Sequence, residues 1–330
     1  MCETHPPKGI LDTLPLTVEL SGNPQRDKLT KRGIRKAISH AQAKRLLELN
    51  TPLTKQYERT LFCGSSLRVM GDGSVKSWFC GKRWCPVCSA NKQGEMINGY
   101  QEAVNRMEEP YMVTLTVPAV KAPELSETIK GLPYAFRLIK DTLRKQGVKL
   151  VGIRKIECNY NPKKETYNPH YHMLVDGELE AQALHCYWLK HHPEAVPEAQ
   201  DIQPAQEGTL KELVKYTTKT IVGKKFYPHA TDNINKALRG VRTFQAYGGI
   251  RKAQEAPQSP EDPSPDTIPT PEEISPHREA ETVIQNYYWW GDGWYNSEGI
   301  ALVYIEYSDN MERLLKNIRG APLGWYYKLE

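Results

Sequence analysis

The sequence predicts an α+β protein built on an antiparallel sheet, and three observations lead to this prediction. Between residues 111 and 220 the apolar pattern follows the order strand, helix, strand, strand, helix, strand, which is the split βαβ order of an antiparallel sheet. Four cysteines lie close together before this run, between residues 63 and 88. An acidic segment rich in tryptophan and tyrosine follows it. We therefore expect a central sheet domain with a metal-binding segment before it and a small module after it.

Charge is distributed unevenly along the chain. Residues 254–330 carry 14 acidic and 5 basic side chains, a net charge of −9, which leaves 39 basic and 25 acidic side chains, or +14, for residues 1–253. A basic body suits a polyanion such as nucleic acid, although a solvated basic surface gives the same count. No apolar run approaches the ~18 residues of a membrane span and no leader pattern is present, so we expect a cytoplasmic protein.

Residues 1–58 are predicted to be a basic N-terminal region. The first 25 residues are rich in Pro, Gly and Thr and read as a tail, and residues 28–49 have apolar positions at helical spacing among lysines and arginines. Such a helix fits along DNA phosphates, and it fits equally well as a solvated helix face.

The cysteines have the spacing of a structural metal site. Cys85 and Cys88 form a Cys-x-x-Cys step, and Cys63 and Cys80 complete a set of four thiols within 26 residues. Four thiolates close a tetrahedral site around zinc and leave no open coordination position. A redox Cys-x-x-Cys pair or unrelated thiols are the alternatives. The intervening segment 82–84 is basic and aromatic, as a surface that faces nucleic acid would be.

The sheet domain is expected to run from residue 59 to 253. A helix with apolar residues from Met96 to Met107 follows the cysteines. The split βαβ run, of ferredoxin or RRM-like order, then comprises strands at 111–117, 150–160, 167–175 and about 201–203, with helices at 124–146 and 179–190 and a further helix from 209 to about 220. Pro118 and Gly147 end two of these elements.

Two histidines on one predicted strand form half of a catalytic metal site. His170 and His172 alternate with Tyr171, so both imidazoles lie on one face of the strand. Glu157 lies on the preceding strand of the hairpin and would face one of them across the ladder. One carboxylate and two imidazoles with open positions suit Mg²⁺ or Mn²⁺. A half-buried strand with incidental histidines, and a solvated Glu157, are the structural alternatives.

The predicted helix at 209–220 carries the remaining candidate residues. Glu212, Tyr216 and Lys219 are spaced four and then three apart, which would place them on one helical face. Attack by a tyrosine on a phosphodiester yields a covalent phosphotyrosine, and a nearby lysine lowers the cost of the developing negative charge. A lone tyrosine on a helix is more often part of a core, and Glu212 is equally explained as a surface acid near a helix N-terminus, paired with Lys211 or Lys215.

Beyond the sheet domain, composition changes twice. Residues 254–282 are rich in Pro, Ser and Glu and read as a linker. Residues 283–330 contain most of the tryptophans, with an expected strand at 300–307 and a helix at 311–318. We expect a small aromatic module, whose aromatic side chains serve a core or a protein partner, or stack on bases.

The motifs together resemble those of the HUH endonucleases, specifically plasmid rolling-circle replication initiators of the single-tyrosine class. The resemblance covers about residues 60–252. It rests on Thr-Leu-Thr-Val-Pro at 114–118, on His170-Tyr171-His172, on Tyr216-Thr217-Thr218-Lys219, on Cys63-Gly64, on the segment from Phe79 to Cys88, and on the segment from Ala237 to Arg242 with Gly248-Gly249. The chain departs at Asn168, where many members have histidine.

The resemblance implies a metal-dependent, origin-specific nickase and strand transferase of a plasmid or phage-like element. Tyr216 would keep the 5′ end of the cut strand and free a 3′-hydroxyl primer, and Glu212 matches a glutamate that activates water at termination in one branch. The implied partners are single-stranded or hairpin origin DNA, with a host helicase and polymerase, and a dimer is one assembly to consider. An HUH transposase or conjugative relaxase shares this chemistry, and a non-catalytic zinc-dependent regulator shares only the DNA binding.

Overall fold

Two β-sheets organise the chain in the computed structural model, which describes residues 23–71, 74–215, 218–219, 221–222, 225–253 and 283–319. The first sheet has the strand order β10 (Phe244–Tyr247), β4 (Gly152–Asn161), β5 (Thr166–Asp176), β3 (Pro110–Thr116) and β6 (Asp201–Pro204), and β7 (Thr218–Lys219) also pairs with β4. The second has the order β13 (Ala301–Tyr304), β12 (Gly293–Tyr295), β11 (Val283–Trp289), β1 (Ser66–Met70) and β2 (Val75–Ser77).

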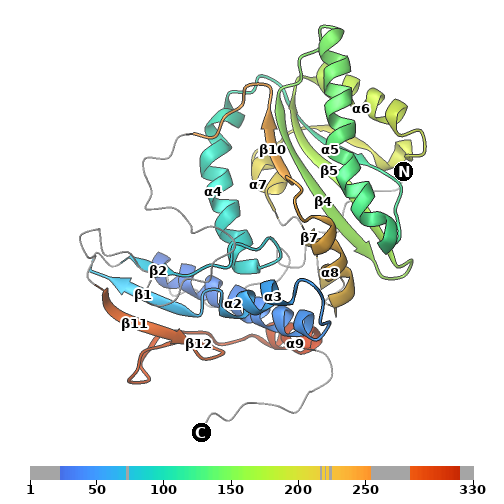
Figure 1. Ribbon diagram of the computed structural model, residues 1–330. Helices are drawn as coiled ribbons and strands as arrows, with labels where there is room; N and C mark the ends of the chain where they lie inside the picture. The colour runs from blue at the N-terminus through green and yellow to red at the C-terminus, as the bar shows by residue number, and fades with distance from the viewer. Residues whose placement is uncertain are drawn as a thin grey trace.

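The first sheet has the split βαβ arrangement that the sequence predicts. Along the chain, β3, α5 (Ala122–Lys145), β4, β5, α6 (Glu178–His191) and β6 follow one another, and in space the strands lie in the order β4-β5-β3-β6 with every neighbouring pair antiparallel. Figure 1 shows α5 and α6 together on one side of these strands. The prediction of an α+β fold around an antiparallel sheet is therefore confirmed.

Apolar residues on both faces of the sheet hold the helices. Tyr171 and Met173 of β5 belong to the core that contains the buried positions of α5. On the opposite face, Ile153 and Leu174 pack with side chains of α4 (Pro86–Asn105) and α7 (Thr209–Leu213). Burial of each such side chain stabilises the fold by roughly 1.5–3 kcal/mol. Since α4 and α7 contact the sheet near Ile153 and Leu174, the polar residues further along β4 and β5 form a site on that same face.

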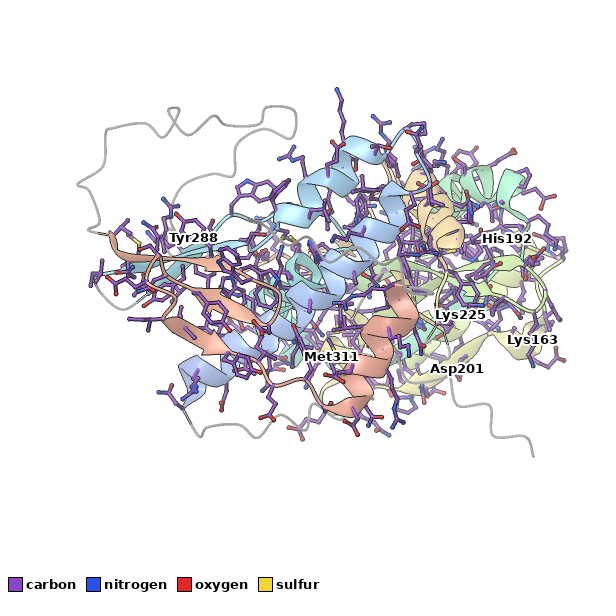
Figure 2. All side chains as sticks on the ribbon, turned by 90° about the horizontal axis from the view of Figure 1, so that it is seen from below. Lys163, His192, Asp201, Lys225, Tyr288 and Met311 are labelled. Carbon is purple, nitrogen blue, oxygen red and sulfur yellow. The ribbon has the colours of Figure 1, made fainter. Side chains whose placement is uncertain are left out.

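The second sheet combines segments from both ends of the chain. β1 pairs antiparallel with β11, so that Leu67 lies opposite Tyr287. Its helices are α2 (Pro24–Leu47), α3 (Thr54–Phe62) and α9 (Asp309–Arg319), and Figure 2 shows α9 with Met311 beside α2. Parts of the regions predicted as 1–58 and 283–330 thus share one core, and the domain boundaries themselves stay a prediction.

One predicted element is wrong. The helix expected from 209 to about 220 ends at Leu213, and Thr218–Lys219 form β7, which runs parallel to β4 beside Cys158 and Asn159. The edge of β4 offers backbone hydrogen-bond partners there, and β-branched Thr218 suits an extended backbone. Glu212 and Lys219 therefore do not lie on one helical face.

The remaining described elements are short. They are η1 (Pro197–Ala199), β8 (Ile221–Val222), β9 (Lys225–Phe226) and α8 (Pro228–Ala237). Among the helices that the structure describes, none has the length and apolar character needed to cross a bilayer.

Candidate active site

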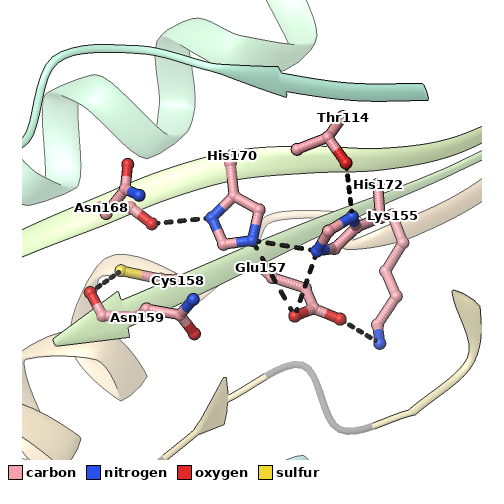
Figure 3. A network of polar contacts seen from close by, with 8 residues as sticks. All are labelled: Thr114, Lys155, Glu157, Cys158, Asn159, Asn168, His170 and His172. Carbon is pink, nitrogen blue, oxygen red and sulfur yellow. Dashed lines mark hydrogen bonds and ion pairs between the residues drawn. The ribbon is translucent and has the colours of Figure 1, made fainter. Parts of the chain in front are cut away.

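The pairing of β4 with β5 brings the predicted metal ligands together. Glu157 lies opposite His170, and His172 lies between Lys155 of β4 and Thr114 of β3. Side chains alternate along a strand, so these residues project from one face, while Tyr171 projects into the core beneath α5. Figure 3 shows the two imidazoles and the carboxylate converging from adjacent strands.

The distances among these side chains fit a single metal ion. The Nε2 atoms of His170 and His172 are 3.2 Å apart, and Oε2 of Glu157 is 4.0 Å from the first and 3.8 Å from the second. Two nitrogens bound to one ion at about 2.1 Å each are separated by about 3 Å at the angles of common coordination geometries. Two imidazoles and one carboxylate leave further positions for substrate, so the donor set fits a catalytic divalent ion.

The Nδ1 atom of each imidazole, which faces away from the carboxylate, contacts a polar group of the protein. His170 Nδ1 lies 2.9 Å from the carbonyl oxygen of Asn168, to which it donates, so the lone pair of the neutral ring lies on Nε2, which faces the site. His172 Nδ1 lies 3.1 Å from the hydroxyl of Thr114. Partners of this kind fix ring orientation in metal sites. Thr114 and Asn168 are thus positioning residues.

Glu157 is buried but ionised. Burial alone would raise the pKa of Glu157, but the positive charge of Lys155 and the two facing imidazoles lower it to about 2. Lys155 Nζ lies 2.7 Å from Oε1 of Glu157, which leaves Oε2 turned toward the histidines. The carboxylate therefore stays charged at neutral pH with one oxygen directed at the proposed ion.

Among the other candidate residues, the structure describes Glu212 and the backbone of Lys219. Glu212 is exposed at the end of α7 and its carboxylate pairs with Lys215. Tyr216 lies outside the described residues. The backbone of Lys219 is described in β7, which pairs with Cys158 and Asn159, directly after Glu157. On the other side of Glu157, the amide of Ile156 donates to the carbonyl of Thr243 at 2.7 Å.

The four cysteines form a separate cluster. Their Sγ atoms are buried, with Cys63 3.4 Å from Cys88 and 3.6 Å from Cys85, and Cys80 3.6 Å from Cys88. Four sulfurs at about 2.3 Å from a tetrahedral ion are separated by about 3.8 Å, which is close to these distances, whereas a disulfide requires about 2.05 Å. The arrangement fits a closed structural metal site, and zinc is the ion that a four-thiolate set most often holds.

Polar groups around the cluster support thiolates. The backbone amide of Cys80 donates to Sγ of Cys63 at 3.4 Å, and the hydroxyls of Ser39 and Thr60 lie 3.2 Å from Cys85 and 3.6 Å from Cys80. Ser39 comes from α2 and Thr60 from α3, so both helices are fixed against the cysteine segment.

Known proteins resemble much of this chain. A family model described as a replication protein matches residues 74–178. "Protein rep" of Lactiplantibacillus plantarum is 31% identical over 230 residues, which cover 58% of this chain and 71% of that protein. The chain belongs to the replication protein family. "Protein rep" of Staphylococcus aureus is 31% identical over 158 residues, and that of Streptococcus pneumoniae is 36% identical over 135 residues. These two alignments span 65% and 40% of the relatives' own length, and 46% and 36% of this chain. No solved structure matches it significantly.

The matched segment of this replication protein holds the whole Glu157, His170 and His172 group together with Cys80, Cys85 and Cys88, and it ends before Glu212. Thr114 and Lys155 also lie within it. Thr114 opens the Thr-Leu-Thr-Val-Pro motif, but neither residue was predicted to contact the candidate metal ligands. Their positions follow from strand alternation once the register is known, because each lies directly opposite His172.

Proposed function

We propose that this replication protein initiates rolling-circle replication of a plasmid or phage-like element by nicking one DNA strand at its origin. The observation that carries the proposal is the convergence of His170, His172 and Glu157 on one sheet face, in a member of the replication protein family. A divalent ion bound there, Mg²⁺ or Mn²⁺, supplies Lewis-acid polarisation of the scissile phosphate. Zinc bound by the cysteine cluster would have a structural role.

The chain's own residues account for the rest of the reaction. His170, His172 and Glu157 hold the ion, while Lys155 keeps the buried carboxylate charged. Tyr216 is the nucleophile: its phenol releases its proton to solvent as the oxygen bonds to phosphorus, the bond from phosphorus to the 3′ oxygen breaks, and the departing oxygen takes a proton from solvent to become the primer hydroxyl. Lys219 offsets the negative charge that develops on the phenolate.

The position of β7 supports this choice of nucleophile. Thr218 pairs with Cys158, the neighbour of Glu157 on β4. Position 216 precedes Thr218 by two residues, a chain length of about 7 Å at most. Along the chain, the proposed nucleophile therefore stands two residues before a strand that pairs directly beside Glu157.

Replacement of Tyr216 by Phe tests the proposal. The variant lacks the attacking oxygen and keeps the ring, so we expect it to lose nicking of single-stranded origin DNA and to lose the covalent adduct that survives denaturing electrophoresis. DNA binding and thermal stability should stay near those of the wild type. Undiminished nicking with an adduct still present would contradict the assignment.

Glu212 is proposed to act as a general base at termination. A single-tyrosine initiator has its nucleophile occupied after one round, and a carboxylate near the site can activate water to cleave the regenerated junction. Glu212 is exposed, and its carboxylate stays accessible to solvent although it pairs with Lys215. For Glu212→Gln we expect initiation nicking within roughly tenfold of wild type, since the lost group serves the other step, and accumulation of plasmid multimers in cells. Equal loss of nicking and termination would instead assign Glu212 to the first step or to the fold.

A further inference from the structure

A groove separate from the metal-binding face lies where the cysteine segment meets α3 and the end of α8. Its volume is about 1220 Å³, and it is bounded by residues 52–62 on one side, 78–84 on the second and 235–240 on the third. Figure 1 shows α3 and α8 close to each other beyond the end of the first sheet. Two segments that the sequence marks separately, the basic and aromatic 82–84 and the segment 237–242, thus meet in one concave surface.

The groove is strongly basic. Its lining contains one acidic residue, Glu58, and five basic ones: Lys55, Arg59, Lys82, Arg83 and Arg239. Arg83 donates through Nη1 to the carbonyl of Leu238 at 2.9 Å and through Nη2 to that of Val241 at 2.8 Å, so it joins the two walls. Lys55 and Arg239 are exposed on different walls. A concave surface with this excess of cations concentrates a polyanion.

Aromatic side chains lie among these cations. Phe62 is 66% exposed at the end of α3 and lines the groove. The guanidinium of Arg59 lies over the ring of Trp78, 5.6 Å from its centroid. Trp84 also lines the groove, and its Nε1 has no hydrogen-bond partner among the described residues. Aromatic faces beside phosphate-binding cations are the features with which proteins hold unpaired nucleotides, because the bases stack on the rings.

One wall of the groove continues to the proposed nicking site. Leu238 and Val241, which accept from Arg83, precede Thr243 by a few residues, and the carbonyl of Thr243 accepts from Ile156 next to Glu157. A DNA strand that follows this wall would pass from the groove to the part of β4 beside Glu157.

We propose that this groove binds a segment of single-stranded DNA that continues from the strand held at the metal site. The inference deepens the proposed function and rests on it. Lys55 and Arg239 would contact phosphates from two different walls, and Phe62 would stack on a base. Single-stranded DNA is favoured over duplex because the bases of a duplex are stacked on one another and offer no free face to Phe62.

The test measures binding by the full chain in the presence of EDTA, which prevents cleavage. The probe is a fluorescent oligothymidylate of about 30 nucleotides, longer than the ~4–16 nucleotides of common single-strand sites. For Lys55→Ala with Arg239→Ala we expect the slope of log binding constant against log salt to fall by about 1.4, because two phosphate contacts are lost. Phe62→Ala should weaken binding about tenfold, and this loss should vanish on an abasic probe of the same length.

A matched variant on α5 controls for general charge and aromatic content. Lys130, Tyr134 and Arg144 are exposed on α5, which packs on the opposite face of the sheet from the histidines. Their joint replacement by alanine should leave oligothymidylate binding within about twofold, with a salt slope reduced far less than by the groove variant. Unchanged thermal stability and zinc content of all variants would show that the folds are intact.

Three results would overturn the inference. They are binding by the groove variants within twofold of wild type, an equal loss in the α5 variant, and an equal loss for a DNA duplex without single-stranded ends. Failure of the nicking proposal is recognised separately, because the binding assay needs no cleavage. If Tyr216→Phe still nicks DNA but the groove variants lose single-strand binding, the groove stands and the nucleophile is wrong.

Discussion

The two carboxylate oxygens of Glu157 contact different partners. Oε1 pairs with Lys155 at 2.7 Å, and Oε2 faces the two imidazoles. Both Lys155 and Glu157 are almost fully buried. A buried charge that loses its partner costs far more than the intact pair contributes. Lys155 therefore has a structural role as the partner of a buried carboxylate, and it also keeps Glu157 charged.

This arrangement predicts different results for one substitution and for two. Glu157→Gln should lose about 3–5 kcal/mol of folding stability, because the Lys155 ammonium loses its buried carboxylate partner. Adding Lys155→Met should restore most of that loss. Neither variant should bind Mn²⁺ with wild-type affinity in calorimetry, since Oε2 is missing from both. Wild-type Mn²⁺ affinity in the double variant would show that Glu157 is not a ligand.

Among individual residues, the sequence predicts the candidate metal ligands but not the side chains that position them. Alternation in His170-Tyr171-His172 is enough to place both imidazoles on one face, and the hairpin brings in Glu157. The exact partner cannot be read, because registers that differ by two residues keep the same faces. The structure selects Glu157 opposite His170 and Lys155 opposite His172.

Helix α2 shows how composition can mislead about an element. Its many lysines and arginines suggest a solvated or DNA-facing helix, yet Lys36 is fully buried. Its Nζ donates to the carbonyl of Leu61 at 2.5 Å and to Ser65 Oγ at 2.7 Å. Burial lowers the pKa of Lys36 to about 8, and the nearby thiols of Cys63, Cys85 and Cys80 partly oppose that effect. Part of the positive charge on α2 is therefore buried near the cysteine cluster and does not face solvent.

The same helix predicts a pH effect on stability. Burial, and then the charges of Lys36, Lys44 and Arg319, lower the pKa of His40 to about 4. His40 is thus neutral in the folded chain at pH values where it is protonated in the unfolded chain. The stability that the folded chain gains from neutral His40 is fully present above the pKa of the unfolded chain, about 6.5. It is lost as the pH falls toward 4, and the free energy of unfolding should drop by about 2 kcal/mol by about pH 5.

Urea unfolding at about pH 7.5 and about pH 5 measures this contribution. His40→Gln removes the titrating group, so the difference in free energy of unfolding between the two pH values should be about 2 kcal/mol smaller in the variant. His229 lies on a different helix, α8, and His229→Gln is the matched control. An identical pH dependence in wild type and His40→Gln would contradict the assignment.

The arrangement of the whole molecule depends on contacts that are distant in sequence. The strands and helices between 110 and 204 were predictable because the apolar periodicity of each element is local. The hairpin was predictable because β4 and β5 follow each other directly in the chain. The pairing of β1 with β11 joins residues 66–70 to 283–288, and nothing in either segment indicates the other. The end of α7 was missed for the same reason, since a strand edge supplied from β4 competes with helical periodicity after Leu213.

The cysteine cluster links the two halves of the molecule, and this leads to a prediction about zinc. Ser39 and Thr60 contact it from α2 and α3, while Arg83, between Cys80 and Cys85, holds the wall at Leu238 and Val241. We expect about one zinc ion per purified chain, because four thiolates saturate a single tetrahedral ion. The binding energy of a structural metal is also folding energy, so its loss should loosen α2, α3 and the groove together.

Cys85→Ser and zinc chelation test this link. Both should abolish stoichiometric zinc in elemental analysis, increase hydrogen exchange in α2 and α3, and weaken oligothymidylate binding, as expected when a structural metal and its folding energy are removed. Mn²⁺ binding at His170 and His172 should persist in Cys85→Ser, because β3, β4 and β5 pack on α5 and α6 through a separate core. Replacement of the exposed Cys186 by Ser should change none of these quantities. A reduced protein that contains no zinc, or that forms a disulfide between Cys85 and Cys88, would contradict the structural role of the cluster.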